Sequence, residues 1–166
     1  DKQGLTVSKS IQSISYLYSE EYELAEQAIT QSLELARETN NMFTLAQSLI
    51  GMSLVNIMKG NLDEAHDTLI ESLDFSQRQG LLVLMLMGLT VYAKWLHSKG
   101  DLETALMVVT QVLLYPSNFI RATEHIAQML NEKLITELDG NTVREAQERG
   151  RSLDMDQLIV EIVKNG

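Results

Sequence analysis

The chain has 166 residues, a formal net charge of −10, no cysteine and one proline. Its length predicts a single domain, and an apolar fraction of 45% excludes a disordered chain. The negative charge repels phosphate backbones, so we expect no direct nucleic-acid binding by this segment. The absence of cysteine excludes disulfides and fits a cytoplasmic protein. The longest apolar run, residues 81–93, is too short to cross a bilayer, so no membrane span is expected.

A short segment repeats along the chain at a constant interval. It reads SEEYELA at 19–25, KGNLDEA at 59–65 and KGDLETA at 99–105. Each copy is typical of the end of one helix, a turn and the start of a second helix. Such a pattern predicts pairs of antiparallel helices along most of the chain.

Residues at the turns support this interpretation. Gly60 and Gly100 are suited to the left-handed conformation that ends a helix. Asn61 and Asp101 then cap the helix that follows. In the first copy, Glu20 stands where the glycine is expected. One turn into each second helix lies an alanine, which predicts close contact between helices. These alanines are Ala25, Ala65 and Ala105.

Paired helices with KG[ND]L[DE]xA at the turn resemble the tetratricopeptide repeat. The 40-residue period is similar to the long-repeat form found in bacterial multidomain signal-transduction ATPases and transcriptional regulators, including the maltose-regulon activator. The resemblance covers about residues 5–137. Residues 145–163 are similar to the closing segment of those regulators. The matching positions are Ala146, Gly150, Arg151 and Leu153, whereas Gln147 replaces the usual aromatic residue.

This resemblance implies an all-α fold, a right-handed superhelical solenoid of antiparallel helix pairs with three to four repeats. We expect one domain over 1–166, with repeats at about 5–39, 41–79 and 81–115, a degenerate repeat at 117–150 and a capping helix at 152–164. Gly150 is predicted to end the helix before the cap, and Ser152 to cap the last helix. Because the chain begins with Asp1, we expect it to be a piece of a longer parent chain. The resemblance of the closing segment implies that this parent carries an ATPase and an output domain.

Residue types that carry chemistry do not form a catalytic or metal-binding pattern. His66, His97 and His125 lack metal-ligand spacing. The letters Asp63-Glu64-Ala65-His66 also occur in a helicase motif, but here they lie at the acidic start of a predicted helix. No GxxxxGK[ST] phosphate loop accompanies them. We therefore expect no enzyme activity, no cofactor and no metal.

The first helices of stacked pairs usually line a concave surface that binds partners. The register predicts a partner-binding groove formed by Gln47, Ile50, Leu54, Ile57, Met58, Met87, Thr90, Val91, Lys94 and His97. The first repeat would add Ser10, Ile11, Ile14, Leu17 and Tyr18. The alternative is that these side chains are buried against neighbouring helices of the same chain.

These features predict a protein–protein interaction or sensor module of a bacterial signalling or transcriptional regulator. It would bind a protein, a peptide or neighbouring domains of the parent chain through the groove, without catalysis. One alternative is self-association as a homodimer through the all-apolar stretch 81–89. Another is a receptor for a small ligand or signalling peptide.

Overall fold

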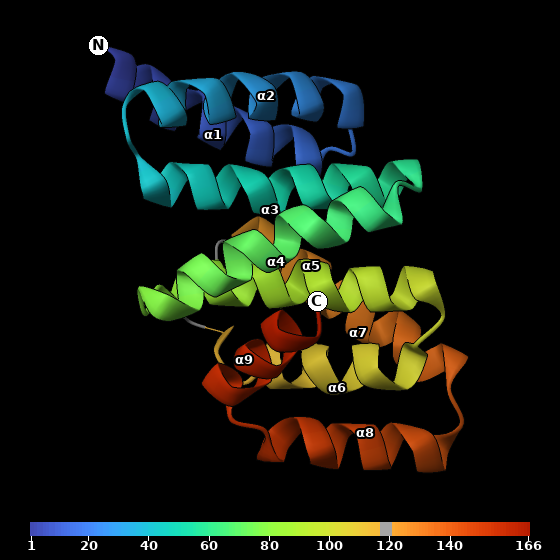
Figure 1. Ribbon diagram of the computed structural model, residues 1–166. Coiled ribbons are helices and arrows are strands. Elements are labelled where there is room, and N and C mark those ends of the chain that lie inside the picture. The colour runs from blue at the N-terminus through green and yellow to red at the C-terminus, as the bar shows by residue number, and fades with distance from the viewer. Residues whose placement is uncertain (117–120) are drawn as a thin grey trace. The chain divides into compact units, whose positions relative to one another are not determined.

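The computed structural model describes residues 1–116 and 121–166, and the regular structure in these ranges is helical (Figure 1). Sequential helices pack antiparallel, which confirms the predicted all-α class. The nine described helices are α1 (Lys2–Tyr18), α2 (Tyr22–Glu38), α3 (Met42–Lys59), α4 (Leu62–Arg78), α5 (Leu82–Lys99), α6 (Leu102–Val112), α7 (Arg121–Glu137), α8 (Gly140–Ser152) and α9 (Met155–Asn165). The right-handed superhelix stays a prediction. The first four residues of the predicted fourth repeat, 117–120, lie outside the described residues, as does the side chain of Tyr18.

The chain divides into two compact units, residues 1–72 and residues 73–166, with the boundary inside α4. In the first unit, α2 packs against α1 and α3, and α1 also contacts α3. These three helices lie side by side in Figure 1. In the second unit, α6 packs against α5, α7 and α8, and α7 also contacts α5. The prediction of a single domain over 1–166 stays a prediction.

Five evenly spaced turns of the chain share one backbone conformation. Residues 20, 40, 60, 80 and 100 all have positive φ. At each turn this residue donates its N–H to the carbonyl three residues back, and the next residue donates to the carbonyl five residues back, at 2.8–3.3 Å. This pair of bonds is the Schellman motif that closes a helix. Gly60 and Gly100 are confirmed as helix ends, and Glu20 and Asn40 adopt the same conformation without being glycine.

The residue after each left-handed position begins the next helix. Asp101 accepts a hydrogen bond from the backbone N–H of Thr104 at 3.2 Å, which confirms its predicted capping role. Asn41 caps α3 in the same way through Thr44, at 3.0 Å. Glu21 makes no side-chain cap bond. The backbone turn is therefore constant, whereas the capping chemistry varies from one helix to the next.

Small residues lie where the helices approach each other. Ala25, Ala65 and Ala105 are fully buried, as the repeat predicted. In the first unit, Ser53 Oγ lies 2.6 Å from Thr68 Oγ1, and Ser48 Oγ donates to Ser32 Oγ at 2.9 Å. Hydroxyl pairs of this kind satisfy polar groups between helices that are too close for larger side chains. The apolar core around them contains Ile29, Leu33, Leu49 and Val55.

The two glycines at the ends of α8 have different environments, and one corrects a prediction. Gly150 does not end a helix, because α8 continues to Ser152. A Cβ on Gly150 would lie 2.5 Å from the carbonyl oxygen of Met107, so glycine is required there for α8 to approach α6. Nothing lies within 4 Å of a Cβ on Gly140.

The start of the last helix also differs from the prediction. Ser152 does not cap it, because its hydroxyl donates to the carbonyl of Arg149 within α8. Asp154 takes the capping role by accepting from the backbone N–H of Gln157 at 2.9 Å, so α9 begins at Met155 and not near residue 152. Both residue types are good caps. The hydrogen bond that the Gln111 amide donates to the carbonyl of Leu153 fixes the extended link between the two helices.

Replacing Gly60 with alanine should lower the free energy of unfolding by about 1 kcal/mol, because φ is +82° there and a Cβ disfavours this conformation. Chemical denaturation followed by circular dichroism measures this loss. Gly140→Ala is the matched control, since that glycine has no positive φ and open space around it. Equal effects of the two substitutions would contradict the assigned turn.

Replacing Gly150 with alanine should cost more, about 1–3 kcal/mol, because the new methyl group meets the backbone of α6 rather than a mobile side chain. The same denaturation experiment, again with Gly140→Ala as reference, measures the difference. A loss no greater than that of the reference would show that α8 does not approach α6 this closely.

Candidate functional site

In the first unit, two residues of the predicted groove are joined by a hydrogen bond. Ser10 on α1 donates to Gln47 Oε1 on α3 at 2.5 Å. Further along, Leu17 Cδ1 lies 3.6 Å from the position of a Cβ on Gly51. The second contact involves residues that come later in both α1 and α3 than those of the first contact. The two helices therefore run in the same direction. The hydrogen bond places Ser10 and Gln47 on the adjoining sides of α1 and α3.

Large apolar side chains on this side of α1 and α3 are open to solvent. Val7 precedes Ser10 by three residues and Phe43 precedes Gln47 by four, so both lie one turn before the hydrogen-bonded pair on the same side. Val7 is 46% exposed, Phe43 44% and Met58, further along α3, 42%. We call this surface the first-helix face. It consists of Val7, Ile14, Phe43, Gln47 and Met58, whereas Ser10, which donates to Gln47, is buried.

Most of the predicted groove residues are buried. Six of them are less than 9% exposed, namely Ile50, Leu54, Ile57, Met87, Thr90 and Val91. Met58 is exposed, and Gln47, Lys94 and His97 are partly exposed. A partner can therefore touch only these four of the ten without a rearrangement of the helices. The groove as a whole stays a prediction.

In the second unit, a carboxylate links the partly exposed histidine to a lysine. His97 Nε2 on α5 lies 2.8 Å from Glu137 Oε2 on α7. The other carboxylate oxygen of Glu137 lies 3.8 Å from Lys133 Nζ. Met129, four residues before Lys133 on α7, is 54% exposed. The cluster combines an imidazole, a carboxylate and an ammonium group beside an accessible apolar side chain.

An aromatic pair lies on the same helix as His97. The rings of Tyr92 and Trp95 stack with their centroids 5.6 Å apart, and Lys99 Nζ lies 5.7 Å from the centre of the Trp95 ring. Burial of the phenol, with a smaller effect of Asp101, raises the pKa of Tyr92 above its ordinary value. Stacking and the cation over the indole ring hold these side chains in place.

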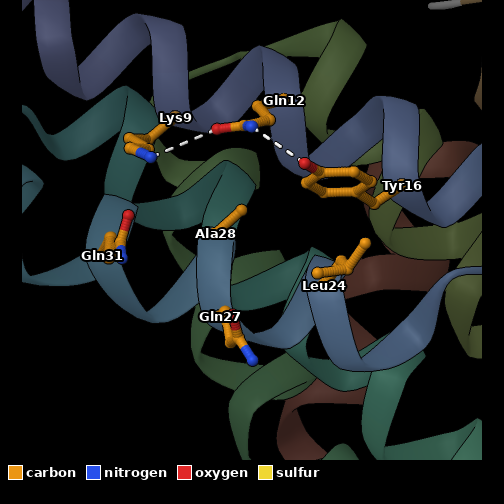
Figure 2. Close-up of a pocket in the computed structure, with 7 residues that line it drawn as sticks. All are labelled: Lys9, Gln12, Tyr16, Leu24, Gln27, Ala28 and Gln31. Carbon is orange, nitrogen blue, oxygen red and sulfur yellow. Dashed lines mark hydrogen bonds between the residues drawn. The ribbon is translucent and has the colours of Figure 1, made fainter.

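A small hollow lies between α1 and α2 (Figure 2). Lys9 Nζ donates to Gln12 Oε1 at 3.2 Å, and Gln12 Nε2 donates to the Tyr16 hydroxyl at 3.0 Å. The hollow has a volume of about 80 Å³, whereas sites for drug-sized ligands begin at about 300 Å³. It offers no ground for a small-molecule site. The other lining residues are Leu24, Gln27, Ala28 and Gln31.

Within residues 1–116 and 121–166, no group of three or more His, Asp or Glu side chains is placed to hold a metal ion. Within the same ranges no helix combines the length and the apolar character needed to cross a bilayer.

The sequence predictions missed Val7, Phe43 and Glu137. Helical periodicity could have found Phe43, because it lies four residues before Gln47 on the same stripe. The repeat could have found Glu137, because it lies one repeat period after His97 and equivalent positions of consecutive repeats are neighbours. What these patterns do not reveal is how much of each side chain remains exposed.

In comparisons with known protein families, curated proteins and solved structures, none matched this chain.

The contact between His97 and Glu137 should appear as a coupling energy of about 0.5–1 kcal/mol in a double-mutant cycle of His97→Ala and Glu137→Ala. The measured quantity is the free energy of unfolding of the four proteins at one fixed pH. A parallel cycle with Lys133→Ala is the control, because that pair is longer and Lys133 is more exposed. A coupling energy for His97 and Glu137 that is equal to or smaller than that for Lys133 and Glu137 would contradict the assigned contact.

Proposed function

We propose that this chain is a protein-binding module whose first helices hold a segment of another protein, with no bond made or broken. The observation that carries the proposal is the first-helix face. Val7, Phe43 and Met58 are each more than 40% exposed on one side of α1 and α3. Exposed large apolar side chains on one side of an ordered scaffold favour an interaction site.

The repeat belongs, in this proposal, to the long tetratricopeptide type, with helix pairs wound into a right-handed superhelix. Support comes from the 40-residue period, from the evenly spaced left-handed turns and from the buried alanines of each second helix. The closing segment at 145–163 favours an origin in the C-terminal region of a bacterial signalling or transcriptional regulator. Neighbouring domains of such a parent would receive the signal of partner binding.

Binding would use a preformed surface. Gln47 Oε1 already accepts the hydrogen bond from Ser10, so the amide N–H₂ of Gln47 is left to donate to a backbone carbonyl of the partner. Apolar side chains of the partner would cover Val7 and Phe43 on one side of this donor and Met58 on the other. Because α1 and α3 are packed on α2, little ordering is needed on binding.

Self-association is a second candidate function, and the outer part of α1 favours it. Leu5 is 47% exposed and Ile11 is 60% exposed. The equivalent residues of α3 in the next repeat, Leu45 and Gly51, pack on the core of the first unit. A second copy of the chain could cover the corresponding side of α1. The stretch 81–89, predicted as a dimer interface, is buried from Leu84 onward.

A photo-crosslinking amino acid in place of Phe43 should capture a discrete partner in the cells that produce this protein. Leu24 on α2 is the matched control position, because it is 40% exposed and Phe43 is 44% exposed. Mass spectrometry identifies each adduct. A partner captured at position 43 and not at position 24 is the expected result. Equal labelling at both positions would contradict the proposal, and an adduct of two copies of this chain would replace it with self-association.

A further inference from the structure

The acidic residues of this protein avoid the first helices of the first three pairs, whereas α7 contains Glu124, Glu132 and Glu137. The chain has 23 Asp and Glu residues, and none lies in α1, α3 or α5. These three helices contain 17, 18 and 18 residues. Their charged residues are lysines, with one histidine in α5. A random distribution would put several carboxylates there, so the segregation calls for a physical reason.

In the first unit the segregation leaves a strongly negative body with an uncharged face. Residues 1–72 contain eleven Asp and Glu against four Lys and Arg, a net charge of −7 with histidine neutral. All eleven lie on α2, on α4 or in the segments flanking helices. The cations of α1 and α3 do not reach the first-helix face. Lys2 pairs with Glu38, Lys59 pairs with Glu26, and Lys9 lies on the side of α1 toward α2 (Figure 2).

With this distribution of charge, the carboxylates that attract a partner are not the groups that touch it. Charges within about 10 Å of a surface attract or repel an approaching partner at moderate salt. Carboxylates inside the contact would have to lose water, which costs several kcal/mol unless each finds a cation. A face made of apolar and amide groups, surrounded at some distance by solvated carboxylates, avoids that loss and keeps the attraction. A partner that fits the uncharged face and the surrounding negative charge has apolar side chains for contact and positive charges that stay in water.

We propose that the first-helix face binds a basic amphipathic helical segment of another protein. Its apolar side covers Val7, Phe43 and Met58, and its Lys and Arg residues remain hydrated in the negative field of α2 and α4. This inference rests on the proposed function and adds the chemistry of the partner. A second copy of the chain fits less well, because two molecules of net charge −10 repel each other.

Three synthetic peptides of about 18 residues, long enough for about five helical turns, test the proposal on the complete chain. They share one apolar stripe and differ only on the polar side, which carries lysine, glutamine or glutamate. Association and dissociation rates are measured at about 50 mM and about 500 mM salt. The lysine peptide should bind, with an association rate that falls about tenfold or more at high salt and a dissociation rate that changes less than about twofold.

Variants locate the binding site. Phe43→Ser should speed dissociation of the lysine peptide about tenfold, and Val7→Ser should act in the same direction from α1. Both side chains are nearly half exposed, so the fold should survive, and thermal melting of each variant verifies this. Leu24→Ser is the matched control on α2 and should leave both rates unchanged.

The outcomes separate the two proposals. If Phe43→Ser leaves the rates of the lysine peptide unchanged, the peptide is held by attraction to the acidic helices alone. This result would overturn the inference. Equally fast, Phe43-dependent binding of the glutamine or glutamate peptide would overturn the basic partner and leave the proposed function standing. A dimer of the free chain at micromolar concentration, dissociated by Phe43→Ser, would assign the face to a second copy. If no peptide binds and no partner is crosslinked at position 43, both the proposed function and the basic partner are contradicted.

Discussion

The evenly spaced turn, found at residues 20, 40, 60, 80 and 100, is the constraint on which the rest of the structure depends. A left-handed residue and two backbone hydrogen bonds close each helix, and the next residue already begins the following one. Helices between such turns have 17 or 18 residues, which is about five turns of 3.6 residues. After a whole number of turns the apolar stripe returns to the side on which it began. The interval therefore decides which residues of each helix are buried, and not only where the helix stops.

Close packing follows from the same geometry. A turn of two or three residues leaves little space between consecutive helices, so Ala25, Ala65 and Ala105 are small and fully buried. Gly150 meets the same demand in a different place, where α8 approaches the backbone of α6. In the second unit two polar atoms remain without partners among the described residues, the hydroxyl oxygen of Thr110 and the amide oxygen of Gln111. Both lie on α6, and the Thr110 side chain is the one that lies beside Gly150.

The sequence allowed the fold class, the helix pairs and the glycine turns to be predicted, because each rests on a residue type at a fixed interval. The left-handed conformation of Glu20 and Asn40 was not evident, since hydrogen bonds and packing enforce a conformation that their side chains do not favour. Gly150 was misassigned because a glycine that ends a helix and one that admits a neighbour look alike in the local sequence. For the candidate site, periodicity identified the side of α3 that carries Gln47 and Met58. It could not show that Ile50 and Leu54 on that side are covered, because burial depends on the neighbouring helix.

The separation of carboxylates from the first helices connects the fold to its proposed use. In an amphipathic helix that packs on one neighbour, charge of either sign is tolerated on the outer side. In α1 and α3 the outer side is free of carboxylates although residues 1–72 carry eleven. Val7, Phe43 and Met58 are each more than 40% exposed, so a carboxylate at any of these positions could reach solvent. The proposed binding of a partner would desolvate this side, and the absence of carboxylates from it supports that proposal.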